Sequence, residues 1–147
     1  MVANTRVTPS TPEASHRMRR VRQKNTSPEW ALRRELYARG LRYRIQVQVL
    51  TKPRRVADIA FSGLHVAVFV DGCFWHGCPA HATWPKQNAE FWRTKIQANI
   101  TRDIETDKRL RAAGWKVIRL WAHEEPKAAA RRIARIVRRR RERMRRA

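Results

Sequence analysis

Acidic residues are scarce in this chain of 147 residues, where 12 aspartates and glutamates stand against 34 lysines and arginines. The net charge of +22 opposes compaction and favours a polyanionic partner, of which nucleic acid is the first to consider. A membrane surface is the rival partner, but long apolar runs and signal-like hydrophobic segments are lacking. The sequence therefore predicts a cytoplasmic protein. A compositional bias toward arginine stays open as another explanation of the charge.

Cysteine is equally scarce, with only Cys73 and Cys78 in the chain. In a cytosolic protein such a pair favours metal binding or redox chemistry over a structural disulfide. The spacing C-x4-C does not match the C-x-x-C redox motif. His81 extends it to C-x4-C-x2-H, three donors that suit zinc, and His123 is the best fourth ligand. Ligation by His76 in place of His81, or packed thiols with incidental histidines, are the alternatives.

The length suits a single domain with one modest core. Residues 1–15 are rich in Thr, Pro and Ser, which predicts a disordered N-terminal tail. Residues 16–137 form the predicted domain. Residues 138–147 are mostly arginine and predict a basic C-terminal tail after the last helix.

Hydrophobic periodicity predicts an α/β domain with a mixed sheet and the order α-β-β-β-α-β-α. The first helix begins near Ser27 and stops at Gly40, and the second runs from an Asn88 cap to Ala113. A last helix follows Pro126. The predicted strands span residues 41–50, 55–61, 65–71 and 115–121. The apolar stripe predicted for the long helix consists of Trp92, Ile96, Ile100, Ile104 and Leu110.

Two acids and one histidine suggest chemistry. Asp58 interrupts an apolar strand, where a carboxylate is costly unless it is paired or bound to metal, and Asp71 ends the next strand. His76 lies between the cysteines, and histidine is the usual general base near neutral pH. A carboxylate-bound Mg²⁺ beside such a base can cleave phosphodiesters. An ion pair of Asp58 with Arg54 or Arg55 is the alternative.

The segments FVDGCFWHGCPAHATWP, EFWRTKIQANITRD and GWKVIRLW resemble the Vsr family of very-short-patch repair DNA mismatch endonucleases. MRRVRQKNTSPEWALRREL and RRVADIAF fit the same pattern, so the resemblance covers about Arg17 to Glu124. It implies a restriction-endonuclease-like α/β core, with a mixed β-sheet flanked by helices and a zinc-stapled loop. It also implies a Mg²⁺-dependent nick on the 5′ side of the thymine in T:G mismatches that arise from 5-methylcytosine deamination.

The same resemblance implies partners and a location. The substrate is double-stranded DNA with a T:G mismatch, and a cytosine-5 DNA methyltransferase and downstream repair proteins are the functional partners. A monomer is expected, in the bacterial cytoplasm and at the nucleoid when it is bound to DNA.

Site residues follow from the resemblance position by position. Asp58 matches the Mg²⁺-binding carboxylate, His76 the catalytic base, and Glu29 an acid that supports His76 and the metal-bound water. Val70 stands where the family's metal meets a backbone carbonyl. Asp71 is a further candidate Mg²⁺ ligand, and a hydrogen bond to a nearby group is the alternative. The zinc positions are matched by Cys73, Cys78, His81 and His123. Nucleases of this fold usually have a lysine on the strand that here ends at Asp71. This strand has no lysine, so the resemblance implies that His76 takes the role of base.

Eight residues are candidate DNA contacts: aromatic side chains that match those entering the base stack, arginines suited to the minor groove, and polar residues on one face of the long helix. In that order they are Phe74, Trp75 and Trp92; Arg19, Arg20 and Arg22; and Lys95 and Asn99. Core packing is the alternative for Phe74 and Trp92, and plain solvation for the polar pair. Two alternative functions stay open: a related endonuclease with another DNA target, and a non-catalytic, zinc-stabilised DNA-binding module.

Overall fold

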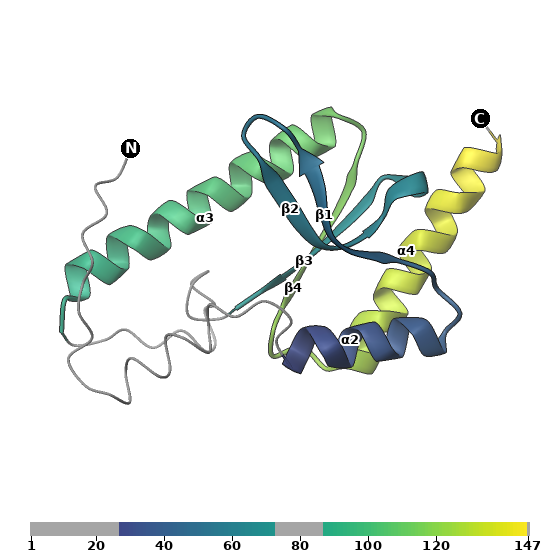
Figure 1. Ribbon diagram of the computed structural model, residues 1–147, viewed down its shortest axis with the longest axis horizontal. Coiled ribbons are helices and arrows are strands. Elements are labelled where there is room, and N and C mark those ends of the chain that lie inside the picture. Colours follow the sequence, from purple (N-terminus) through teal and green to yellow (C-terminus); the bar gives the residue numbers. More distant parts are fainter. Residues whose placement is uncertain (1–26, 73–86, 147) are drawn as a thin grey trace.

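The computed structural model describes residues 27–72 and 87–146 and shows helices on both sides of one sheet (Figure 1). The described elements follow the predicted order. They are α2 (Ser27–Ala38), β1 (Arg44–Leu50), β2 (Arg55–Phe61), the 3-10 turn η1 (Ser62–Leu64), β3 (Val66–Asp71), α3 (Ala89–Ala112), β4 (Lys116–Trp121) and α4 (Pro126–Arg146).

The four strands form a sheet of order β1-β2-β3-β4. The first two pairings are antiparallel and the β3–β4 pairing is parallel, which confirms the predicted mixed sheet. A parallel neighbour requires a crossover, and α3 lies within that connection. The parallel register runs from Val66 opposite Lys116 to Asp71 opposite Trp121. Asp71 and the end of β4 therefore share one end of the sheet.

Alternation along β3 divides the core between the two faces of the sheet. Val66 and Val68 pack with Leu36 of α2 and Ile133 of α4 in the larger cluster. Ala67 and Phe69 point the other way and pack with Leu110 of α3. Figure 1 shows the same arrangement, with α2 beside α4 and the end of α3 across the sheet. Each aliphatic side chain that is fully buried in this way contributes about 1.5–3 kcal/mol.

Two glycines end helices as the sequence predicts. Gly40 and Gly114 have φ of 79° and 89°, the left-handed conformation that glycine adopts without a steric penalty. The start of α3 is less regular. Asn88 precedes the helix as expected, but it has φ 56° and its side chain makes no capping hydrogen bond, so the predicted cap is wrong.

The stripe predicted for α3 is correct at both ends and wrong in the middle. Trp92, Ile96 and Leu110 are buried, whereas Ile104 is 62% exposed and Thr106 is buried instead. Steps of four residues advance 40° beyond a full turn, so three of them rotate Ile104 about 120° away from Trp92. A repeat that alternates steps of three and four would have placed Thr106 on the buried side.

The last helix is longer than predicted. Its buried residues include Ala130, Ile133 and Val137, as expected, but α4 continues through the arginine run to Arg146 instead of ending near residue 137. Arginine is among the better helix formers, and the side chains of residues 141–146 are all exposed. The basic segment is therefore a helical surface, and its charges have fixed positions relative to the sheet.

Candidate active site

Asp58 lies where two strands stop pairing. The β2–β3 ladder ends at Ile59 opposite Val68. One residue before Ile59 in β2, the Asp58 carboxylate accepts a 2.7 Å hydrogen bond from the backbone N–H of Val70. The half-buried acid thus has a backbone donor, which offsets the cost of its position in an apolar strand.

The two arginines considered as ion-pair partners of Asp58 have contacts elsewhere. Arg54 lies in the turn between β1 and β2, and its Nε donates to Gln48 Oε1 of β1 at 3.4 Å. Arg55 Nε donates to Thr106 Oγ1 at 2.9 Å, which links β2 to α3. Both arginines therefore contact other side chains, while the N–H of Val70 donates to the carboxylate of Asp58.

A cluster of one cation and three acids surrounds the end of β3. Arg119 Nη1 lies 3.0 and 3.1 Å from the two carboxylate oxygens of Asp71. Its Nε donates to Asp107 at 2.8 Å, and Asp103 lies 3.7 Å from Nη1. The guanidinium also lies 4.4 Å from the ring centre of Phe69. These contacts tie β3 and β4 to α3 through side chains that are at most 20% exposed.

The three carboxylates of this cluster stabilise the positive charge of Arg119. Burial alone lowers the pKa of Arg119, but the carboxylates of Asp71, Asp103 and Asp107 together raise it above its usual value. Because the guanidinium already meets both oxygens of Asp71, the geometry favours an ion-pair role for Asp71 over the predicted role of Mg²⁺ ligand. The sequence reasoning missed this cluster. The signals for it in the sequence were two acids one helical turn apart, Asp103 and Asp107, and Arg119 in the middle of a strand.

Glu29 lies in the first turn of α2 and is 6% exposed. Arg33 Nη2 contacts its carboxylate at 3.3 Å, one turn further along the helix. The neighbouring Pro28 lines a small cavity together with Val70 and Trp121. The start of α2 therefore lies at the same end of the sheet as the Val70 amide, as expected for an acid that serves a site there.

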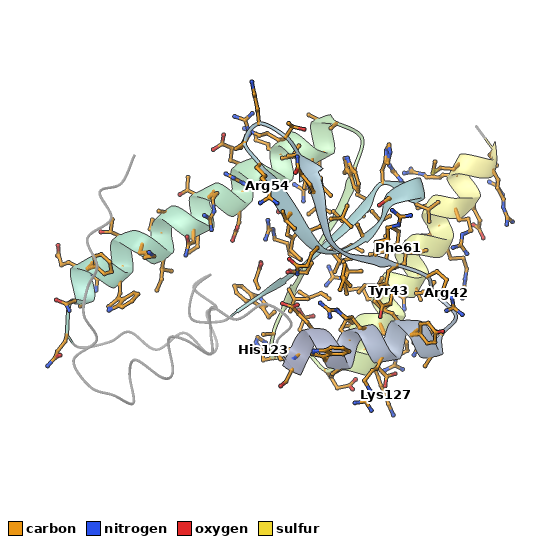
Figure 2. All side chains as sticks on the ribbon, viewed as in Figure 1. Arg42, Tyr43, Arg54, Phe61, His123 and Lys127 are labelled. Carbon is orange, nitrogen blue, oxygen red and sulfur yellow. The ribbon has the colours of Figure 1, made fainter. Side chains whose placement is uncertain are left out.

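His123 belongs to the same end of the molecule. It lies two residues after the end of β4 and is exposed, and Figure 2 shows it beside the start of α2. The Glu124 carboxylate accepts a 2.6 Å hydrogen bond from the N–H of Trp121, which closes the turn that carries the histidine. The fold thus brings Glu29, Asp58 and His123 to one end of the sheet.

The described candidates for DNA contact lie on α3. Trp92 is 4% exposed and packs edge-on against Phe91, with ring centres 5.2 Å apart, which favours a packing role. Lys95 is exposed, and Asn99 accepts a hydrogen bond from Arg102 Nη2 at 3.3 Å. Lys95 therefore points away from the core, as either DNA contact or solvation requires, whereas Asn99 is half-buried.

Several predicted site residues lie outside the described ranges: the candidate base His76, three zinc ligands, two aromatic residues and three arginines. In that order the last eight are Cys73, Cys78 and His81; Phe74 and Trp75; and Arg19, Arg20 and Arg22. Among residues 27–72 and 87–146, no group of three or more His, Cys, Asp or Glu side chains is placed to hold a metal ion. The predicted zinc-stapled loop is therefore not shown.

The four-stranded mixed sheet, with helices on both faces, fits a restriction-endonuclease-like fold. The family model described as DNA mismatch endonuclease Vsr matches residues 8–81. The type II nicking enzyme V.NaeI of Lentzea aerocolonigenes is 43% identical over 117 residues, which cover 76% of this chain and 68% of the relative. V.NmeDIP of Neisseria meningitidis serogroup C, also described as a type II nicking enzyme, is 42% identical over 122 residues, covering 78% and 77%.

The chain belongs to the Vsr family of DNA mismatch endonucleases. It is accordingly a hydrolase that nicks DNA, and DNA is its substrate. A nuclease of this family is expected to use a divalent metal ion. In the part of the chain that the structure describes, no helix is both long and apolar enough to cross a membrane.

Proposed function

We propose that this endonuclease nicks DNA on the 5′ side of the thymine in T:G mismatches, in a reaction that depends on Mg²⁺. The family description supports a mismatch as the substrate. The observation that carries the chemistry is the Asp58 carboxylate, held by the Val70 N–H at 2.7 Å where β2 and β3 stop pairing. Such mismatches arise when 5-methylcytosine deaminates, so a cytosine-5 methyltransferase and downstream repair proteins are the proposed functional partners.

The residues present suit a magnesium ion. Mg²⁺ prefers hard oxygen ligands and binds through one or two carboxylates while it keeps several waters. Asp58 provides such a carboxylate, and the hydrogen bond to Val70 fixes its orientation. Asp58 and the carbonyl of Val70 would hold the ion, with Asp71 as a weaker candidate because Arg119 contacts both its oxygens. When bound, the ion stabilises negative charge on the scissile phosphate.

The chain's own residues supply the proton transfer. In this proposal His76 takes the proton of the attacking water as the general base, and Glu29 orients His76. The contact with Arg33 at 3.3 Å holds the Glu29 carboxylate in place, as such an orienting role needs. The products are a 5′-phosphate and a 3′-hydroxyl. A monomer suffices, because a strand-specific nick needs a single active site.

A structural zinc ion is the second proposed metal. Cys73, Cys78, His81 and His123 provide the donor set of a closed tetrahedral site, and His123 lies at the end of the sheet that carries Asp58. The substitution Cys78→Ser should lower both the zinc content and the melting temperature. Elemental analysis of the purified variant measures the first quantity, and one zinc ion per chain in that variant would rule out Cys78 as a ligand.

The deciding experiment is a nicking assay on end-labelled duplexes that carry one T:G mismatch, with fully paired duplexes alongside, in Mg²⁺ and in EDTA. We expect a Mg²⁺-dependent cut in the thymine strand alone. Asp58→Asn should lower the nicking rate at least ~10²-fold, because the amide keeps an acceptor for Val70 but loses the charge. Glu105→Gln is the matched control, since it removes one exposed carboxylate on α3.

Three outcomes of this assay would overturn parts of the proposal. Equal cutting of paired and mismatched DNA would favour a related endonuclease with another target. The description of the relatives as type II nicking enzymes is compatible with that alternative. Equal rates in Mg²⁺ and EDTA would remove the metal from the reaction. Equal rates for the Asp58→Asn and Glu105→Gln variants would remove Asp58 from it. The non-catalytic binding module is no longer an alternative, because the chain belongs to an endonuclease family.

A further inference from the structure

A basic surface covers the end of α4, far from the candidate active site. Residues 138–146 contain seven arginines and one acid, Glu142. The helix fixes these charges in space, because its apolar side, with Ile133 and Val137, is buried against the sheet. That burial also argues against a membrane as the partner, since an interfacial helix needs a free apolar face to insert.

Part of this surface is concave. A pocket of about 390 Å³ is lined by the basic residues Lys116, Arg139, Arg140, Arg143 and Arg146, with Glu142 as the acidic neighbour. Arg140 fixes the helix at this point: its Nε donates to the carbonyl of Leu64 at 3.0 Å, and its Nη2 donates to the carbonyl of Gly114. The remaining basic lining residues are exposed. We call this group the α4 basic pocket.

The α4 basic pocket lies at the opposite end of the sheet from Asp71. Lys116 begins β4, whereas the strand residue opposite Asp71 is Trp121, which ends it. The 21 residues of α4 span about 30 Å at 1.5 Å per residue. Figure 1 shows the helix running from its start beside α2 to the far end of the molecule. A rise of 3.4 Å per base pair makes that distance about nine base pairs of duplex.

We propose that the α4 basic pocket binds the sugar-phosphate backbone of duplex DNA outside the nicked site, without regard to sequence. Guanidinium groups match phosphate oxygens in a two-pronged geometry, and clustered cations gain affinity by releasing counterions. A second contact on the same duplex strengthens binding through effective concentration and needs no new base contact. This inference goes beyond the proposed function and does not depend on which mismatch is nicked.

The test compares two triple substitutions on the same half of α4. Arg139→Gln, Arg143→Gln and Arg146→Gln change the pocket. Arg138→Gln, Arg141→Gln and Arg145→Gln change three exposed arginines on another side of the helix, with the same loss of charge. Binding to a fully paired 40-base-pair duplex is measured between 50 and 200 mM salt.

We expect the pocket variant to bind more weakly. The slope of log affinity against log salt should become less steep by up to about 2.7, which is ~0.9 for each lost phosphate contact. The control variant should change the slope by less than half as much. A duplex of about eight base pairs is too short to reach from the active site to the pocket, so the gain from a second contact is lost and the difference between the two variants should shrink. Nicking under single-turnover conditions with saturating enzyme should stay at the parent rate in both.

Equal slopes for the two variants on the long duplex would overturn the proposal, because net charge alone would then explain the effect. A pocket variant that loses single-turnover nicking at saturation would also overturn it, since the surface would then act in the reaction. Failure of the mismatch proposal would look different. It would change which duplex is nicked but leave the binding of paired DNA and its salt slope intact.

Discussion

Replacing Arg119 by methionine is the sharpest test of how the candidate site is held. Methionine keeps much of the side chain's length but removes the cation between Asp71, Asp103 and Asp107. Hydrogen bonds to charged groups contribute about 1.5–3 kcal/mol each, and Arg119 makes them to two carboxylates. Breaking a buried pair costs about 3–5 kcal/mol. With side chains 11–20% exposed, we expect a loss of about 3–4 kcal/mol in the free energy of unfolding.

That loss is large for a domain whose total stability is typically about 5–15 kcal/mol. At about 2–4 °C per kcal/mol, the melting temperature should fall by roughly 10 °C. Urea unfolding followed by tryptophan fluorescence measures the free energy directly. Arg119→Lys should lie between the parent and Arg119→Met, because an ammonium keeps the charge but cannot reproduce the two-pronged contact with Asp71 and Asp107.

A second measurement separates stability from positioning. Asp71 directly follows Val70, whose N–H holds Asp58, so loss of the Arg119 contacts should also lower nicking at a temperature where the variant is fully folded. We expect kcat to fall more than KM rises, since DNA contact is unaffected. A stability loss below 1 kcal/mol for Arg119→Met would show that solvent screens the cluster as it screens a surface pair, and would refute the reasoning.

Two further predictions test the helices. Ile96→Ala should lower the free energy of unfolding by about 2–5 kcal/mol, because Ile96 is buried. Ile104→Ala, at an exposed position of the same helix, should change it by less than about 0.5 kcal/mol. Equal losses for the two variants in urea unfolding would mean that the buried side of α3 is misassigned. Glu125 accepts hydrogen bonds from the N–H groups of Lys127 and Ala128, which lower its pKa below 4.5. Its contribution is therefore present above that pH and is lost as the pH falls through the lowered pKa. Glu125→Gln should melt below the parent at pH 7, and the gap should narrow as the pH falls below 4.5; a gap that stays constant over that range would contradict this cause.

The parts of the fold that follow from local pattern could be predicted from the sequence. The period-two runs gave the strands, and glycines with no Cβ ended α2 and α3 at Gly40 and Gly114. Errors appeared where spacing was extrapolated or composition was given too much weight. Ile104 was placed on the stripe by steps of four, and the arginine run was expected to end a helix that in fact continues to Arg146.

The candidate site was predictable to a different degree for each residue. An acid inside an apolar strand indicated Asp58, but only the fold shows that Val70 is its donor, because that contact joins two strands. Asp71 was considered as a metal ligand because it is an acid at the end of a strand, and its partner Arg119 lies 48 residues away. No local pattern connects such a pair. The interactions that the sequence could not reveal are therefore those between charged groups on different elements.

The distribution of acids explains how a chain with net charge +22 can both fold and bind DNA. Among the acids of residues 27–72 and 87–146, seven are buried or half-buried: Glu29, Glu35, Asp58, Asp71, Asp103, Asp107 and Glu124. Three of these meet Arg119 and one meets Arg33, so these four acids neutralise arginines of the interior and not the cations on the surface of α4. The exposed face of α4 keeps its positive charge as a result. An acid placed there would relieve repulsion within the protein, but it would also weaken attraction to phosphate.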